Sequence, residues 1–150
     1  MTELAIRNVQ AADLPRVQEM VRKLAAHHGD VAQVSLTDLE RDCLGAEPWL
    51  RVLVAVRGVE ISGYAALCSL VQMQFGVRGM DMHHLFVSEE ARGIGVGRAL
   101  IDASVALTKS LGCRYMTVGT HPENKAAAMI YQVAGFEPLP SPGPRFRIRF

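Results

Sequence analysis

The sequence lacks a surplus of charge of either sign. It has 16 Lys and Arg against 15 Asp and Glu, which gives a formal net charge of +1 at pH 7 over 150 residues. Without a basic surplus, charge gives no support for binding to nucleic acid or to an anionic membrane surface. We therefore expect neither nucleic acid nor a membrane among the partners.

Long apolar runs and paired cysteines are lacking as well. The sequence begins without a basic stretch followed by an apolar run, and no uncharged apolar stretch is long enough to span a bilayer. The cysteines, Cys43, Cys68 and Cys113, are odd in number and form no C-x-x-C pair, which disfavours a disulfide framework or a cysteine-built zinc site. These absences predict a cytoplasmic protein without a metal.

Apolar residues are plentiful enough for one core. Hydrophobic types make up 49% of the chain, and no linker, repeat or low-complexity tract divides it, so residues 1–150 should form a single domain. Alternation and helical spacing predict strands over 4–9, 49–56, 60–70, 81–87, 115–118 and 145–150, and helices over 14–28, 37–44, 97–111 and 125–134. We expect Thr37 and Glu40 to form a capping box, Arg57-Gly58 to turn a hairpin, and Asn124 to cap the last helix.

Glycines cluster after the predicted strand 81–87, in the segment Arg92-Gly93-Ile94-Gly95-Val96-Gly97-Arg98. Glycine lets the backbone turn tightly and bring its N–H groups close to a ligand, and the N-terminus of the next helix adds partial positive charge. The segment is therefore either a phosphate or pyrophosphate cradle or a plain tight turn. It is neither a P-loop nor a dinucleotide fingerprint, because G-K-[ST] is missing and Arg98 stands where G-x-G-x-x-G needs its last glycine.

The same segment contains R-x-x-G-x-G, and residues 86–100 closely resemble the acetyl-CoA motif of the GNAT superfamily of N-acetyltransferases. A second likeness lies downstream, to the pattern N-x-x-A-x-x-x-Y-x-x-x-G-F, in Asn124, Ala127, Tyr131, Gly135 and Phe136. Two matches in the right order and separation are more specific than either alone. The order of the predicted elements extends the likeness over nearly the whole chain.

The resemblance implies an α/β (α+β) fold, in which about four helices flank a mixed, mostly antiparallel sheet. That sheet would splay between its two central parallel strands, here 82–87 and 115–118. Acetyl-CoA would be the cosubstrate, with its pyrophosphate on the backbone N–H groups of residues 94–98. Its pantetheine arm would pair with the backbone of Leu85, Phe86 and Val87, and Asn124 would lie near the cofactor.

Tyr131 matches the family position that protonates the departing CoA thiolate. A phenol with a pKa near 10 is suited to protonate a sulfur leaving group if it lies within hydrogen-bond reach. Without the motif, Tyr131 would be interpreted as a buried aromatic residue of the last helix. The resemblance therefore favours Tyr131 as general acid and as a cofactor contact.

The attacking amine must lose a proton, and His83 and His84 are the candidate bases. Alternation along a strand would send them to opposite faces, so they would not share a metal and only one would face the cleft. We favour His83, which has the parity of Leu85; the alternative is a strand histidine satisfied by its neighbours. We assign His27 and His28 to the end of the first helix, and no role to His121.

The expected activity is transfer of an acetyl group from acetyl-CoA to a primary amine, on a small molecule or a protein. The alternative is a non-catalytic acyl-CoA-binding or regulatory module. The Glu47-Pro48-Trp49 region resembles the diamine and thialysine acetyltransferase branch, but that branch has an acidic pair where this chain has His83-His84. This change weakens a polyamine assignment unless Asp81 or Glu60 compensates.

A homodimer is expected through the predicted last strand, 145–150. Alternation places Phe146, Ile148 and Phe150 on one face of it and three arginines on the other, which leaves an apolar face to be covered. Members of the family often pair through this region. The alternative is that the strand folds back onto its own sheet.

Overall fold

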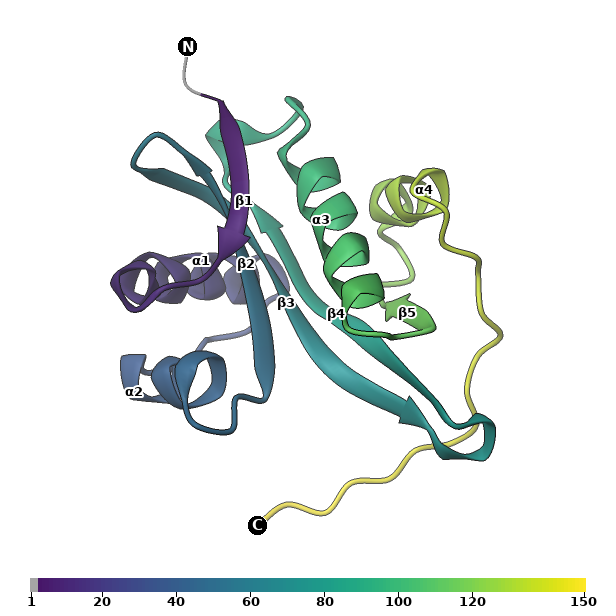
Figure 1. Cartoon of the computed structure of the whole chain (residues 1–150). Helices are drawn as coiled ribbons and strands as arrows, with labels where there is room; N and C mark the ends of the chain where they lie inside the picture. The colour runs from purple at the N-terminus through teal and green to yellow at the C-terminus, as the bar shows by residue number, and fades with distance from the viewer. Residues whose placement is uncertain (1–2) are drawn as a thin grey trace.

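A five-stranded sheet in the order β1-β2-β3-β4-β5 organises the computed structural model, which describes residues 3–150 (Figure 1). Its strands are β1 (Leu4–Asn8), β2 (Leu50–Arg57), β3 (Glu60–Gln72), β4 (Val77–Val87) and β5 (Tyr115–Val118). The pairs β1–β2, β2–β3 and β3–β4 are antiparallel, and β5 runs parallel to β4. The predicted mixed, mostly antiparallel sheet is therefore confirmed.

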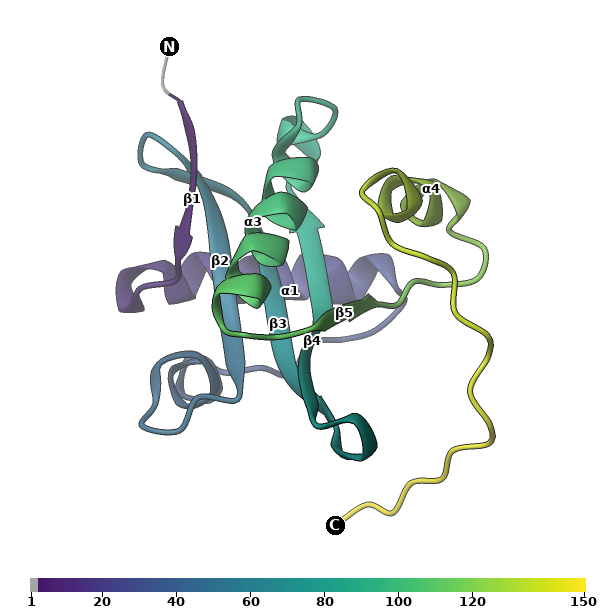
Figure 2. The same ribbon diagram turned by 45° about the vertical axis from the view of Figure 1, so that its right-hand side comes forward.

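Helices cover both faces of this sheet (Figures 1 and 2). On one face lie α1 (Leu14–His27), α2 (Leu36–Leu39) and the π-helical turn η2 (Glu40–Leu44) that continues α2. On the other face lies α3 (Val96–Ser110), with α4 (Lys125–Val133) beside it. The short 3-10 turns are η1 (Ala11–Asp13), η3 (Met73–Phe75) and η4 (Glu89–Ala91).

The two faces explain the continuous apolar run of β2. Val52 and Val54 pack in the core beneath α1, whereas Leu53 and Ala55 pack in the core beneath α3. All four side chains are buried. A strand covered on both faces needs apolar residues at every position, so it does not alternate.

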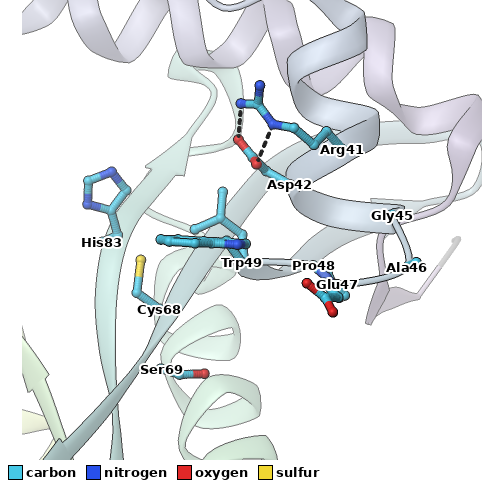
Figure 3. A pocket seen from close by; sticks show the side chains of 11 residues that line it. Arg41, Asp42, Gly45, Ala46, Glu47, Pro48, Trp49, Cys68, Ser69 and His83 are labelled. Carbon is cyan, nitrogen blue, oxygen red and sulfur yellow. Dashed lines mark hydrogen bonds and ion pairs between the residues drawn. The ribbon is translucent and has the colours of Figure 1, made fainter. Parts of the chain in front are cut away.

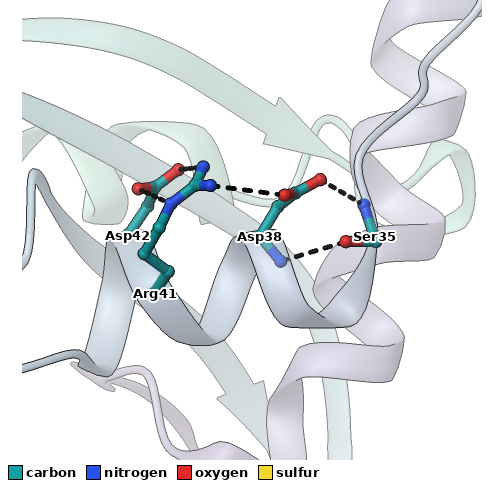
Figure 4. Close-up of polar contacts among 4 residues, drawn as sticks. All are labelled: Ser35, Asp38, Arg41 and Asp42. Carbon is teal, nitrogen blue, oxygen red and sulfur yellow. Dashed lines mark hydrogen bonds and ion pairs between the residues drawn. The ribbon is translucent and has the colours of Figure 1, made fainter.

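The start of α2 differs from the predicted capping box. Ser35 Oγ accepts a hydrogen bond from Asp38 N at 3.0 Å, and Asp38 Oδ2 accepts one from Ser35 N at 2.9 Å (Figure 4). The prediction of Thr37 and Glu40 is wrong because Thr37 already lies inside the helix. Ser35 has the extended backbone of a cap, with φ −96° and ψ 166°. Arg41 then pairs with Asp38 across one turn.

A one-residue bulge at His83 interrupts β4. Ala66 lies opposite His84 and Leu67 lies opposite Met82, so no residue of β3 lies opposite His83. The bulge breaks the alternation of side chains. As a result the imidazole rings of His83 and His84 stack, with centroids 4.4 Å apart and planes 11° from parallel. The expectation that these neighbours lie on opposite faces is wrong.

The sheet opens just beyond this point. β4 and β5 pair only over 79–82 and 115–118, so residues 83–87 of β4 have no partner on the β5 side in the described chain. At the paired end the two strands approach closely, because a Cβ on Gly79 would lie 2.5 Å from the Tyr115 ring. The expected splay between the parallel strands is thus present, and it leaves backbone groups of β4 exposed at an edge.

The C-terminal segment, residues 137–150, forms no helix or strand in the part described. It leaves α4 as an extended trace that ends apart from the sheet (Figures 1 and 2). The prediction of a strand over 145–150 is wrong for the single chain, and the Phe146 side chain is 95% exposed. Alternation supplies two faces, but a strand also needs backbone hydrogen bonds to a neighbouring strand, and residues 145–150 make none in the single chain.

Candidate functional site

The glycine segment between β4 and α3 forms an open cradle of backbone N–H groups. Gly93 and Gly95 have left-handed backbones, with φ +78° and +91°, and a Cβ at either would meet nothing within 4 Å. The flanking amides of Arg92 and Ala99 donate to backbone carbonyls, but in the described chain the amides of residues 93–98 donate to none. Free N–H groups at the N-terminus of a 15-residue helix favour an anionic ligand.

This cradle borders a cavity of about 550 Å³ at the splay between β4 and β5. Nearly all the residues predicted for catalysis or cofactor binding line it: His83, Leu85, Phe86, Val87, Arg92, Gly93, Gly95, Val96, Gly97, Arg98, Asn124 and Tyr131. Ile94 is the one predicted residue that does not line the cavity, and it is 54% exposed. The structure thus brings together residues that lie up to 48 positions apart in the chain, from His83 to Tyr131.

Tyr131 reaches the cavity from α4. Asn124 caps this helix, because its Oδ1 accepts a hydrogen bond from Ala127 N at 3.1 Å. The Tyr131 ring packs edge-on against Phe136, with centroids 5.9 Å apart. Burial raises the pKa of the Tyr131 phenol. The hydroxyl therefore keeps its proton at neutral pH, as a general acid must.

Arg92 lies back against β4. Its Nε donates to the Val87 carbonyl at 3.0 Å, and its guanidinium carbon is 6.0 Å from the centre of the Phe86 ring. These contacts hold the start of the glycine segment against the end of the strand. They also occupy the Val87 carbonyl, which belongs to the stretch 85–87 whose backbone the resemblance assigns to the pantetheine arm.

All five histidines of the chain line the same cavity. His83 and His84 come from β4, His27 and His28 from the end of α1, and His121 from the loop after β5. The sequence prediction gave His27 and His28 only a helix-end role and gave His121 none. No local sequence pattern predicts that these histidines lie together. The end of α1 and the loop after β5 are distant from β4 in sequence, and only the folded chain brings them to the same cavity.

His84 has a buried partner that the sequence analysis missed. The Tyr64 hydroxyl lies 3.0 Å from His84 Nδ1, and the Tyr64 side chain is only 1% exposed. Burial, with smaller contributions from His83 and His28, lowers the pKa of His84 to about 4. His84 is therefore neutral at pH 7. Tyr64 lies in the middle of β3 with no motif around it, so only the register with β4 reveals the contact.

A second, larger cavity of about 1260 Å³ also has His83 in its lining (Figure 3). It is formed by η2, the loop that follows η2, and the β3 residues Cys68 and Ser69. Trp49 is 81% exposed in it, and its indole lies toward His83 and Cys68. Arg41 donates two hydrogen bonds of 2.9 Å to Asp42, so these two charges offset each other. Because His83 lines both cavities, they adjoin at this imidazole.

The other carboxylates that could replace the missing acidic pair lie elsewhere. Glu60 begins β3 and lines neither of these two cavities. Asp81 also lines neither, and its Oδ1 accepts a hydrogen bond from Thr117 Oγ1 at 2.6 Å. Within residues 3–150, no three His, Cys, Asp or Glu side chains gather in a way that could hold a metal ion. None of the helices in that range has the length and apolar character needed to cross a membrane.

Comparison with known proteins gives one consistent family. Residues 17–136 match the acetyltransferase (GNAT) family. A thialysine N-epsilon-acetyltransferase of Sus scrofa is 28% identical over 151 residues, which cover 93% of this chain and 87% of that protein. An L-methionine sulfoximine/L-methionine sulfone acetyltransferase of Pseudomonas paraeruginosa is 23% identical over 95% of this chain and 87% of its own length.

Solved structures agree on the fold. An aminoglycoside acetyltransferase from an uncultured soil metagenomic sample superposes with a TM-score of 0.81 at 18% identity, covering 97% of each chain. An integron cassette protein from the mobile metagenome of V. cholerae superposes with a TM-score of 0.78 at 21% identity, covering 98% of this chain and 93% of that one.

Proposed function

The chain belongs to the acetyltransferase (GNAT) family and is an acetyl-CoA-dependent acetyltransferase, and we propose that its acceptor is a primary amine that attacks the thioester directly. One observation carries this proposal: the cavity at the splay brings a cradle of free N–H groups, the Tyr131 hydroxyl and the His83 imidazole to its walls. Family membership favours this enzyme over a non-catalytic acyl-CoA-binding module.

The residues of the cavity fit a bound CoA. The amides of residues 93–98 and the N-terminus of α3 would hold the pyrophosphate, and the free edge of β4 would meet the amide-bearing arm as an added strand would. Acetyl-CoA supplies the activated acetyl group. No metal is needed for the step proposed below.

Two side chains of this chain would move the protons. The bond between the amine nitrogen and the acetyl carbon forms while the carbon–sulfur bond breaks. Tyr131 would give its hydroxyl proton to the departing sulfur, and His83 would take the proton that the amine releases. The raised pKa of Tyr131 keeps that proton available.

The acceptor amine would enter through the larger cavity, since His83 joins it to the cavity of the cofactor. The relatives with matched length are named for small amino-acid-like acceptors, thialysine and L-methionine sulfoximine or sulfone. A small molecule that carries a primary amine is therefore our first choice of acceptor, ahead of a protein amine. The replacement of an acidic pair by His83-His84 disfavours a polycation.

A panel of amines tests the proposal. The protein would be incubated with acetyl-CoA and, separately, with amino acids, their side-chain analogues, diamines and lysine-bearing peptides. Free CoA would be measured by thiol titration and acetylated product by mass spectrometry. We expect product from at least one primary amine of low molecular mass. Release of CoA without acetylated amine in any sample would contradict the proposed acceptor.

We also propose that the protein pairs with a second copy through residues 145–150. These residues are extended and exposed, and the Phe146, Ile148 and Phe150 side chains are uncovered in the single chain. β5 is an outer strand of the sheet, so its edge is available to a further strand. The preceding segment, with four prolines between positions 138 and 144, is stiff enough to carry the end of the chain outward.

A further inference from the structure

Resting on the proposed role of His83 as base, we propose that Tyr64 and His84 are positioning residues. The Tyr64 hydroxyl holds His84 as a fixed, uncharged imidazole, and that ring supports His83 where the two cavities adjoin. The geometry is a series of contacts from β3 to β4: a hydrogen bond of 3.0 Å from Tyr64 to His84, then a stack of 4.4 Å from His84 to His83.

The first contact fixes the protonation of His84. The hydroxyl of the buried Tyr64 has one hydrogen-bond partner in the structure, His84 Nδ1. A buried phenol needs an acceptor for its hydrogen, so the hydroxyl donates and Nδ1 carries no proton. His84 then bears its single proton on Nε2. The Tyr64 ring itself is held by Phe86, with centroids 6.2 Å apart.

The second contact restrains His83. The His83 side chain is exposed, and an exposed side chain on a strand samples several rotamers. The bulge in β4 places its ring flat on that of His84, which is anchored at Nδ1. The restraint on His83 therefore depends on the anchoring of His84.

A neutral His84 also favours proton uptake by His83. Two imidazolium rings stacked at 4.4 Å would repel each other, so His83 could take a proton only at a cost if His84 were charged. The titratable groups that act on His84 are its neighbour His83 and His28 at the end of α1, and both oppose a charge on it. Burial opposes that charge as well. The arrangement thus leaves His83 as the proton acceptor of the pair.

Nuclear magnetic resonance of the ¹⁵N-histidine-labelled protein tests the first contact without any substrate. At pH 7 we expect His84 to show a proton on Nε2 and a bare Nδ1, and to stay neutral down to about pH 5. In the Tyr64→Phe variant the midpoint of its titration should rise, by about half a pH unit or more. A proton on Nδ1, or titration of His84 near pH 6.5 in the wild type, overturns the proposal whatever the enzyme acetylates.

Kinetics of three variants test the second contact. His84→Ala removes the supporting ring and should lower kcat about tenfold or more with little change in KM for acetyl-CoA. The double variant Tyr64→Phe/His84→Phe restores a flat, uncharged ring at position 84 and removes the Tyr64 hydroxyl that would otherwise lose its partner. We expect it to recover most of the lost kcat. We also expect its kcat/KM to fall in acid as that of the wild type does. Tyr64→Phe alone should have a kcat between that of the double variant and that of His84→Ala.

Three results would overturn the positioning roles. Turnover of His84→Ala within about twofold of wild type would show that the ring supports nothing. A double variant as slow as His84→Ala would show that a nitrogen of His84 acts itself. Absence of turnover in the wild type with every amine would remove the proposed function, and with it the role of His83, while leaving the resonance result on His84 intact.

Discussion

The guanidinium of Arg7 in β1 donates two hydrogen bonds to the carboxylate of Asp13, at 2.7 and 3.0 Å. Asp13 is buried at the start of α1, and its Oδ2 also accepts a hydrogen bond from Gln10 N at 2.7 Å. One carboxylate therefore ties the first strand to the first helix, beneath which much of the core is packed.

This relationship predicts a loss of stability in acid. Hydrogen bonding from Arg7, more than that from Gln10, holds the pKa of Asp13 below its usual value despite burial. A carboxyl whose pKa is lower in the folded state stabilises the fold above its unfolded pKa, near 3.9, and loses that contribution as the pH falls through the folded pKa. Asp13→Asn should lower the free energy of unfolding by about 1–3 kcal/mol at pH 7.

Urea unfolding at pH 7 and at pH 3 checks this prediction. The variant should lose less stability than the wild type between the two pH values, because it lacks the titrating group. Asp102→Asn is the control, since the exposed pair of Asp102 with Arg98 should contribute little. If Asp13→Asn and Asp102→Asn lower the free energy of unfolding equally at pH 7, the buried carboxylate of Asp13 contributes no more to stability than an exposed one.

Replacement of Gly95 should weaken binding of CoA. Its φ of +91° strains any L side chain, and a valine there would project from the cradle of N–H groups. We expect Gly95→Val to raise the Kd for CoA about tenfold or more, measured by calorimetry. Gly76→Val is a matched control, because Gly76 has φ +62° and open space around it but lies between η3 and β4, away from the cavity. An unchanged Kd in folded Gly95→Val would contradict the assignment of the cradle.

Tyr131→Phe should impair turnover rather than binding. The change keeps the ring against Phe136 but removes the proton for the departing sulfur, so kcat should fall by about 10²- to 10⁴-fold with the Kd for CoA nearly unchanged. Because burial raises the pKa of Tyr131, loss of activity from its ionisation should begin only in strongly basic solution. Tyr115→Phe, outside the cavity, is the control. Turnover within a few-fold of wild type would leave Tyr131 a packing residue.

Loss of His83 should change the pH dependence of the reaction. An imidazole changes its charge between about pH 5 and 8, so a histidine base gives kcat/KM an acidic limb in that range. We expect His83→Ala to remove that limb, and His121→Ala, in the loop after β5 that lines the same cavity, to keep it. If the limb persists in His83→Ala, the acceptor amine or another group sets the profile.

The sequence revealed the motif residues of the cavity but not the contacts that its histidines make. The glycine segment, Asn124 and Tyr131 could be singled out in advance because they stand in short motifs that resemble those of a known family, and the structure places them around one cavity. The stacking of His83 on His84 could not be predicted, because the bulge depends on how β4 registers with Ala66 and Leu67 of β3. The Tyr64 contact was missed for the same reason, since it joins residues 20 positions apart across two strands.

The prediction of a last strand over 145–150 was wrong for a different reason. Residues 145–150 have the alternation of a strand, but strand formation requires backbone hydrogen bonds to a second segment, and the single chain provides none there. The sequence prediction placed the capping box two residues too late, at Thr37 and Glu40 instead of Ser35 and Asp38. Both pairs are separated by three positions and they overlap, so their spacing alone does not distinguish them. Only the extended backbone of Ser35 decides between them.

The C-terminal segment predicts the oligomeric state. An isolated chain would leave Phe146, Ile148 and Phe150 in water, and an apolar face of this kind is stable once a second surface covers it. We expect a dimer mass by light scattering at micromolar concentration. Replacing Phe146 and Ile148 by serine should give a monomer, whereas replacing Arg145 and Arg147 by serine should leave the dimer, because the arginines occupy the opposite face of the extended segment. A monomer mass for the full chain would contradict the pairing itself, and a dimer that survives the loss of Phe146 and Ile148 would place the interface elsewhere on the molecule.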